Sequence, residues 1–297
     1  MAIRLGDNQY GKAEVRLMRV TRDGDRHTIK DLNVTSQLRG DFDAVHVAGD
    51  NTNCLATDTQ KNTVYLLART HRITSIEDFA LLLARHFVTG FDYVRGSRQE
   101  IEEYGWSRIR TADGPHDHSF VRDGAEVRTT VVTREGDHEW VVSGLRDLVV
   151  LKSTGSEFRG FPKTPHTTLP DADDRVLATS LTARWRYTGT DVDWNAGYTA
   201  IRATILETFA TTYSLALQQT LYTIGRTVLE TRPEVAEIRL SAPNKHHFAV
   251  DLTPFGEDNP NEVFYAADRP YGLIEATVYR DDAPDAGRAW ESVPGFV

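Results

Sequence analysis

The sequence predicts an α+β fold of two tandem units, each an antiparallel four-stranded sheet with two helices on one face. Some segments alternate apolar and polar residues, as half-buried strands do. Other segments repeat apolar residues every three or four positions, which places them along one side of a helix. These patterns occur in the order strand, strand, helix, helix, strand, strand, and the chain contains that order twice. The order favours helices layered on one face of an antiparallel sheet.

The first unit begins with a strand pair. Residues 15–20 alternate as a strand, residues 22–25 have the composition of a turn, and residues 27–38 form the partner strand. Residues 54–67 are then mostly helical in character.

A second helix of this unit follows Ser75. Asp78 lies three residues after Ser75, in a position like that of a capping box. The apolar stripe of this helix consists of Ile76, Phe79, Leu83 and Phe87. Gly90 ends the helix, and two further strands are predicted at residues 96–110 and 118–132.

The second unit repeats the order without sequence identity to the first. Strands are predicted at residues 138–152, 176–187, 235–240 and 272–279, and helices at residues 195–213 and 217–229. Pro233 ends the second helix, because proline has no backbone N–H to continue it. We therefore predict two domains, residues 1–137 and residues 138–297. Since the helices cover one face of each sheet, the other face must also be covered, and we expect the chain to form oligomers.

The composition excludes several classes of protein. The net charge of −9 argues against a non-specific nucleic-acid binder, which usually carries a basic face. The single cysteine, Cys54, excludes an intrachain disulfide framework and suits a reducing cytoplasm. We expect no secretory signal, no membrane span and, since no glycine-rich phosphate-binding motif is present, no nucleotide cofactor.

Four segments, spread along the chain, carry the most specific signal. They are Tyr10-Gly11-Lys12, the run from Ala56 to Thr63, the run from Leu151 to Phe161, and the run from Ser241 to Phe248. The last segment follows an apolar run with a proline, an amide, a cation and two imidazoles, which suits a strand that ends at a polar site. Together, the four segments resemble the urate oxidase (uricase) family, in that family's order and over nearly the whole chain.

The resemblance implies a more specific architecture. Members of that family have two tandem tunnelling-fold (T-fold) domains in each chain. Two chains complete one barrel, two barrels stack as a homotetramer, and the active sites lie at the interfaces between chains. In the family, the residues that correspond to Thr57 and Asp58 come from the neighbouring chain.

A planar, anionic purine needs a stacking surface, a fork of N–H donors, and an amide that both donates and accepts. Phe158 can supply the surface and Arg175 the fork. Gln218 can supply the amide. The resemblance implies that these three residues bind the substrate together with the backbone N–H of Leu217. The neighbouring Gln219 is an alternative to Gln218, although the surrounding residues favour Gln218.

The resemblance also implies a proton relay formed by Lys12, Thr57 and His246. A lysine in a dry cleft can lose its proton near neutral pH, because burial disfavours the charged form. A threonine hydroxyl can give and take a proton, and a histidine can exchange one near neutrality. Asn244, with Thr57, would hold dioxygen or water over the purine plane, and Asp58 completes the substrate-binding set. From the residues alone, an exposed salt-bridge lysine at Lys12 and an ordinary strand-end histidine at His246 are the favoured interpretations.

The implied activity is the oxidation of urate by O₂ and water to 5-hydroxyisourate and hydrogen peroxide, in purine degradation. Deprotonated urate is electron-rich enough to give an electron to O₂ itself, so the resemblance implies neither a metal nor a flavin. The protein then supplies orientation and deprotonation. Residues 294–297 do not form a Ser-Lys-Leu peroxisomal signal, which favours a bacterial, cytoplasmic protein.

Other functions remain alternatives. Some T-fold enzymes bind pterins or purines through a glutamate, and some use zinc with cysteine and histidine ligands, but no such cluster is evident. A non-catalytic purine-binding or assembly protein is a second alternative, which the relay residues argue against. His116 and His118 would project to the same side of a strand, yet no third metal ligand is apparent.

Overall fold

The computed structural model describes residues 2–292, so the C-terminal residues 294–297 lie outside the part described. The chain divides into two units. Unit 1 contains the chain up to Gly144, residues 186–195 and the segment from Pro284 onward, whereas unit 2 contains residues 145–185 and 196–283. The division therefore passes within the strand β5 (His138–Lys152), a few residues after the predicted domain boundary at residue 137. Two segments of the second half also return to unit 1.

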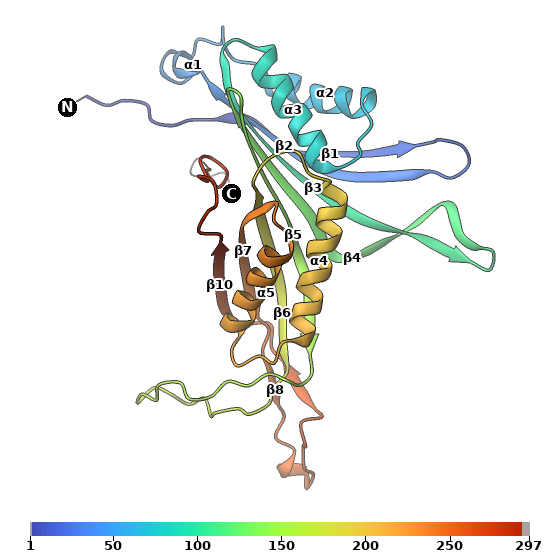
Figure 1. The fold of residues 1–297 in the computed structure, drawn as a ribbon, viewed down its shortest axis with the longest axis vertical. Coiled ribbons are helices and arrows are strands. Elements are labelled where there is room, and N and C mark those ends of the chain that lie inside the picture. The colour runs from blue at the N-terminus through green and yellow to red at the C-terminus, as the bar shows by residue number, and fades with distance from the viewer. Residues whose placement is uncertain (1, 293–297) are drawn as a thin grey trace. The chain divides into compact units, whose positions relative to one another are not determined.

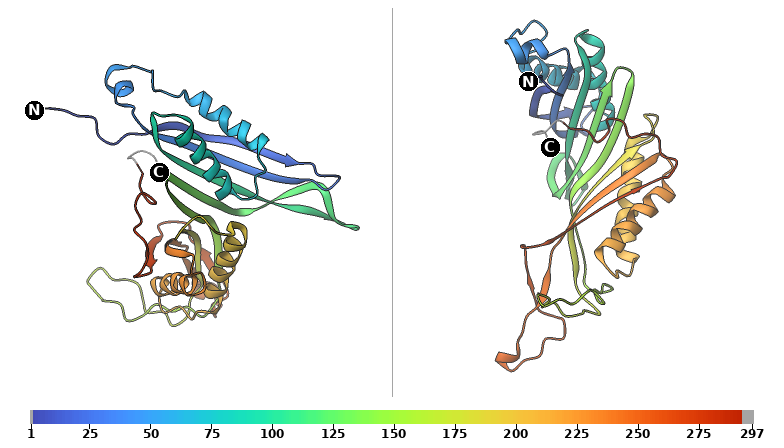
Figure 2. Two further views of the ribbon diagram at one scale, coloured as in Figure 1. Left: turned by 45° about the horizontal axis from the view of Figure 1, so that its top comes forward. Right: turned by 90° about the vertical axis from the view of Figure 1, so that its left-hand side faces the viewer.

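Unit 1 contains an antiparallel sheet in which neighbouring strands follow the chain order. The strands are β1 (Tyr10–Thr21), β2 (Thr28–Gly40), β3 (Val94–Thr111) and β4 (Gly114–Glu135), followed by β5. The helices α2 (Thr57–Thr70) and α3 (Ile76–Gly90) lie on one face of this sheet (Figures 1 and 2). A short helix that the sequence did not predict, α1 (Asp43–Ala48), connects β2 to α2.

The apolar stripe of α3 forms much of the core of unit 1. All four stripe residues are buried, and so are the apolar residues of β2 and β3 on the facing side of the sheet. These are Ile76, Phe79, Leu83 and Phe87 on the helix, and Leu32, Val34, Leu38 and Ile101 on the strands. The predicted cap is confirmed, because the Ser75 side chain accepts a hydrogen bond from the Asp78 N–H at 3.0 Å.

Unit 2 repeats the architecture with different loops. Its sheet runs β5, β6 (Leu177–Tyr187), β7 (Val235–Asn244) and β10 (Gly272–Tyr279). The helices α4 (Trp194–Thr211) and α5 (Leu217–Thr231) cover one face of this sheet (Figure 2). Between β7 and β10 the chain forms a small second sheet, β8 (His247–Ala249) and β9 (Phe264–Ala266), with the short 3₁₀ helix η1 (Thr253–Phe255). The α+β class and the repeated element order are thus confirmed.

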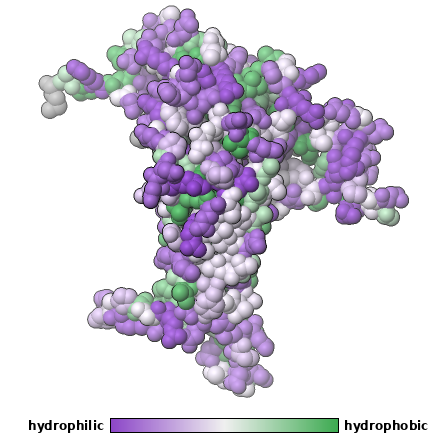
Figure 3. All heavy atoms as spheres, in the orientation of Figure 1, coloured by the Kyte–Doolittle hydropathy of each residue, from purple (hydrophilic) through white to green (hydrophobic). Residues whose placement is uncertain are grey.

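The helix-free face of the unit 1 sheet carries a polar cluster beside apolar side chains such as Met18, Ile29 and Phe120. Asp31 on β2 forms ion pairs with Arg16 on β1 and with Arg122 on β4, and the Trp106 indole donates to the same carboxylate at 3.0 Å. The side of the molecule drawn in Figure 3 carries hydrophilic residues with scattered hydrophobic ones between them. No helix within residues 2–292 is long and apolar enough to span a membrane.

Both outermost strands of the sheet order have an open side. Among the described residues, β1 pairs with β2 alone, and β10 pairs with β7 alone. A strand with unpaired backbone N–H and C=O groups is a template for pairing with another chain. The open edges are compatible with the expected assembly.

Candidate active site

The predicted site residues divide between the two units. Unit 1 contains Lys12, Thr57 and Asp58, whereas unit 2 contains Phe158, Arg175, Leu217, Gln218, Asn244 and His246.

In unit 1, Lys12 and the start of α2 are neighbours. Thr57 is the first residue of α2. The first N–H groups of a helix have no intrahelical acceptor, and the preceding Ala56 provides no side-chain cap for them. The Asp58 carboxylate accepts hydrogen bonds from Lys61 and from Asn62. These bonds, chiefly the one from Lys61, lower the pKa of Asp58, and the nearby charge of Lys12 adds a small share. Lys12 is half-buried rather than fully exposed.

Gly11 allows β1 to approach β2 closely beside Lys12. A side chain at this position would place its Cβ only 1.8 Å from the Ser36 carbonyl oxygen. Lys12 lies directly opposite Ser36, and the register of the two strands shifts immediately after Lys12. Glu14, within this bulge, has a φ of 56°, in the left-handed region. Sequence reasoning used Gly11 only as part of a motif, whereas the structure gives it a steric role.

In unit 2, Arg175 lies over the ring of Phe158, with 5.3 Å between the guanidinium carbon and the ring centroid. Backbone pairing fixes both residues: the Arg175 N–H donates to the Ser156 carbonyl at 2.8 Å, and Phe158 pairs with Ala172. The ring of Phe158 also stacks on that of Phe161, with centroids 4.8 Å apart. The structure thus brings the predicted stacking surface and the predicted fork together.

The Arg175 side chain is partly buried, and one of its donors lacks a partner. Its Nε is buried and has no hydrogen-bond partner among the described residues. Burial accordingly lowers the pKa of Arg175. A buried donor without an acceptor is costly, so this arrangement suits an anionic ligand that would accept the hydrogen bond.

His246 lies close enough to Arg175 for the two to interact electrostatically. Burial is the main reason that the pKa of His246 is lowered, and the charges of Arg175 and His247 lower it further. The lowered pKa favours the neutral imidazole, in which one ring nitrogen carries no proton. It stacks on Phe248, with ring centroids 5.6 Å apart.

The start of α5 presents Leu217 and Gln218. Ala216 precedes the helix without a side-chain cap, which leaves backbone N–H groups available at the helix start. The Gln219 side chain is engaged locally, because its Oε1 accepts the Leu215 N–H at 3.0 Å. Gln218 is exposed. The local engagement of Gln219 favours Gln218 as the residue available to a ligand.

Asn244 is the last residue of β7 and lies opposite Gly272 of β10. Its side chain is buried. The next residue, Lys245, donates its N–H to the Ala178 carbonyl at 2.9 Å and so anchors the segment that leads to His246. The strand ends at the polar segment, as the sequence predicted.

The alternative metal site is not supported. The rings of His116 and His118 lie on the same strand with centroids 4.5 Å apart. Within residues 2–292, however, no group of three or more histidine, cysteine, aspartate or glutamate residues could hold a metal ion.

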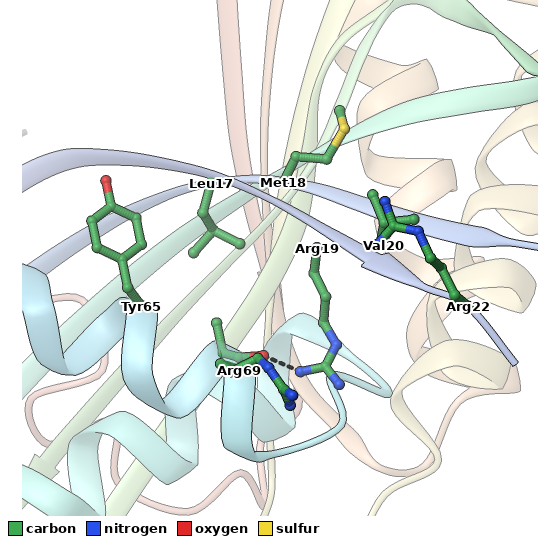
Figure 4. Close-up of a pocket in the computed structure, with 8 residues that line it drawn as sticks. Leu17, Met18, Arg19, Val20, Arg22, Tyr65 and Arg69 are labelled. Carbon is green, nitrogen blue, oxygen red and sulfur yellow. Dashed lines mark hydrogen bonds between the residues drawn. The ribbon is translucent and has the colours of Figure 1, made fainter.

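A surface pocket of about 370 Å³ lies between β1 and α2 in unit 1 (Figure 4). It contains none of the predicted site residues; its lining is Leu17, Met18, Arg19, Val20, Arg22, Tyr65, Ala68 and Arg69. Arg19 donates hydrogen bonds to the carbonyl oxygens of Ala68 and His71 at the end of α2. This arginine therefore caps the C-terminus of α2, a structural role that needs no ligand in the pocket.

The family model for uricase matches residues 8–133 and 141–275 of this chain. The uricase of Arthrobacter globiformis is 57% identical over 292 residues, which cover 98% of this chain and 95% of that protein. The chain belongs to the uricase family. The crystal structure of the Arthrobacter uricase superposes with a TM-score of 0.92, at 57% identity, and the match covers 96% of this chain and 98% of that one.

More distant uricases match as well. The uricase of Dictyostelium discoideum is 38% identical over 278 residues, which cover 92% of this chain and 96% of that protein. A crystal structure of the urate oxidase of Bacillus sp. TB-90 matches with a TM-score of 0.81 and covers 92% of this chain and 100% of that one. Its identity of 23% shows a shared fold alone.

Proposed function

We propose that this member of the uricase family oxidises urate with O₂ and water to 5-hydroxyisourate and hydrogen peroxide, without a cofactor. Urate oxidation is the activity of the family. The reaction would serve purine degradation in the cytoplasm.

The observation that best supports this function is the desolvated guanidinium of Arg175 above the Phe158 ring. Urate at neutral pH is a planar anion. The Phe158 ring offers it a stacking surface, and the guanidinium offers a planar pair of donors at an oxygen–nitrogen edge. The Leu217 N–H and the Gln218 amide would complete the purine contacts.

We propose that Lys12 accepts a proton from urate through Thr57, with His246 at the far end of the relay. The neutral imidazole of His246 suits a group that receives a proton. Asn244 and Thr57 would hold dioxygen or water over the purine plane, and Asp58 would complete the binding set. Holding the reactants in this orientation converts a slow bimolecular encounter into a step within one complex.

The relay and the clamp are proposed to meet between chains of a homotetramer. Thr57 and Asp58 of one chain would complete the Phe158, Arg175 and Gln218 clamp of another. The open edges of β1 and β10 support an assembly in which sheets of different chains join.

The activity is tested with purified protein after exhaustive chelation and without added flavin. We expect loss of the urate absorbance band together with stoichiometric hydrogen peroxide. Urate that binds but is not consumed would favour a non-catalytic purine-binding protein. Activity that is lost with a tightly bound metal and restored by it would contradict the cofactor-free mechanism.

Shared sites are tested by mixing inactive Thr57→Ala and Arg175→Ala chains. Some hybrid interfaces then contain neither lesion, so partial activity should return after subunit exchange. Verified hybrids without any recovered activity would contradict sites shared between chains.

A further inference from the structure

A chain of buried polar side chains supports the segment that leads into α2. The Tyr10 hydroxyl of β1 donates to the Leu55 carbonyl oxygen at 3.1 Å. The Gln60 amide of α2 donates to the same oxygen at 3.4 Å. Two donors from two different elements therefore hold one carbonyl oxygen two residues before Thr57.

The chain of hydrogen bonds continues from Gln60 into the sheet. The Ser36 hydroxyl on β2 donates to the side-chain Oε1 of Gln60 at 3.4 Å. It accepts a hydrogen bond from the side-chain amide of Gln99 on β3 at 3.0 Å. Gln99 also donates to the Ser97 hydroxyl at 2.7 Å. Gln60, Ser36 and Gln99 are fully buried. Since both halves of the Gln60 amide are engaged, its orientation is fixed, and a buried network of this kind specifies one arrangement of its elements.

This network lies directly beside the proposed relay. Ser36 is opposite Lys12 in the β1–β2 register. Tyr10 and Lys12 are two residues apart on β1, so their side chains point to the same face of the sheet. The network thus lies next to Lys12, the proposed proton acceptor, in the sheet, and next to Thr57 along α2.

The geometry of Tyr10 suits a fixed donor. Its ring packs edge-on against Phe42, with centroids 4.8 Å apart. Burial, followed by the neighbouring Cys54, raises the pKa of Tyr10 far above its ordinary value, so the hydroxyl keeps its proton. At the start of α2, by contrast, Ala56 offers no side-chain cap that could fix the helix end.

We infer that Tyr10 and Gln60 are positioning residues, which hold the Leu55 carbonyl and so set the place of the Thr57 hydroxyl relative to Lys12. The inference rests on the proposed function, in which Thr57 carries a proton to Lys12. A hydroxyl displaced from the line between urate and Lys12 slows the chemical step, whereas the clamp in unit 2 still binds urate.

The first experiment compares steady-state kinetics of Tyr10→Phe and Gln60→Met with those of Tyr65→Phe. The matched control Tyr65 also joins α2 to β1, because its hydroxyl donates to the Arg16 carbonyl at 3.3 Å, but it lies further along α2 from Thr57. We expect kcat to fall about five- to tenfold in the two network variants with KM nearly unchanged, as for loss of one hydrogen bond that acts in the transition state. Tyr65→Phe should stay within about twofold of the parent.

The second experiment is a double-mutant cycle, measured by single-turnover urate consumption. If Tyr10 acts through Thr57, then Tyr10→Phe should change the rate by less than about twofold in a Thr57→Ala background. If the rate losses of the two single variants multiply in the double variant, the inference is overturned. A lower melting temperature of Tyr10→Phe with an unchanged kcat would overturn it as well. Should Tyr10→Phe fail to fold, the same cycle with Gln60→Met decides.

The single variant Thr57→Ala separates the inference from the function on which it rests. Full turnover in Thr57→Ala would show that the proposed relay itself is wrong, and the positioning role would fall with it. If Thr57→Ala turns over slowly and the rate losses of Thr57→Ala and Tyr10→Phe multiply in the double variant, the relay stands and only the role of Tyr10 is rejected.

Discussion

Unit 1 and unit 2 share an element order but present different chemical groups. Unit 1 offers a half-buried lysine beside a threonine at a helix start, Lys12 and Thr57. Unit 2 offers a desolvated guanidinium above an aromatic ring, Arg175 and Phe158. The first pair suits proton transfer and the second suits recognition of a planar anion. Under the proposed function, the same layered scaffold would serve two tasks, because function depends on the site rather than on the fold.

The helix starts show the same division. Ser75 caps α3 with its side chain, whereas α2 and α5 begin after Ala56 and Ala216 without a side-chain cap. The starts of α2 and α5 carry predicted site residues and the capped start of α3 carries none, although α1 also begins without a side-chain cap and carries none. An uncapped helix start leaves N–H groups for a ligand, at the cost of about 1 kcal/mol of helix stability.

The largest effect is expected for Lys12→Met. If unit 1 serves the chemical step, kcat should fall about 10²- to 10⁴-fold with KM little changed, since general base catalysis is lost. Steady-state kinetics measure kcat and KM, with Lys30→Met on β2 as the control. An intact kcat with a raised KM and a strong salt dependence would instead make Lys12 an electrostatic guide.

Arg175→Lys tests the clamp in unit 2. A point charge cannot replace a planar fork, so urate affinity should weaken about tenfold to a hundredfold. Anaerobic titration with urate measures binding without turnover. Arg159→Lys is the matched control, because Arg159 lies in the same loop region and forms an exposed ion pair with Asp173. Unchanged affinity in Arg175→Lys would place Arg175 outside the site.

The two kinds of helix start are compared by removing one cap and adding another. Ser75→Ala should lower the free energy of unfolding by about 1 kcal/mol and leave the kinetics unchanged. Ala216→Ser should stabilise the protein by up to about 1 kcal/mol, because Ala216 already has the extended backbone of an N-cap. The new hydroxyl would compete for the N–H groups at the start of α5, so KM should rise.

Urea denaturation and steady-state kinetics on the same preparations measure both changes. A Ser75→Ala variant that loses turnover without losing stability would contradict the division between structural and functional helix starts. An Ala216→Ser variant with an unaltered KM would show that the start of α5 makes no contact with urate.

The smallest effect concerns the protonation of His246. Its pKa in the folded protein lies below the ordinary value of 6.5, so the unfolded chain binds a proton more readily. The stability that this difference contributes is present in full above about pH 6.5 and is lost as the pH falls through the folded pKa. His246→Gln should therefore lose less stability than the parent between pH 7 and the acid range. In Arg175→Gln, nuclear magnetic resonance titration should find a higher His246 pKa. An unaltered pKa would show that the charge of Arg175 does not act on His246.

The sequence by itself determined the elements and their order. Alternating and helical apolar spacing located the strands and the helices, and the fit was closest for β5 and β10, whose bounds match the predicted ranges. The motif runs also predicted the candidate site residues of each unit. These features are local or follow from resemblance, so they can be read from neighbouring residues along the chain. The small elements α1, β8 and β9 were missed, because a few residues give too short a pattern.

Only the tertiary structure decided which of these groups lose their water and which gain partners. Arg175 reads as an ordinary cation in the sequence, and only packing leaves its Nε buried without an acceptor. Tyr10 and Leu55 are 45 residues apart, yet strand register and the start of α2 bring the hydroxyl to the carbonyl. The ion pairs of Asp31 with Arg16 and Arg122 likewise depend on the register of three strands. Burial and hydrogen bonding depend on contacts between distant segments, which no local pattern of residues contains.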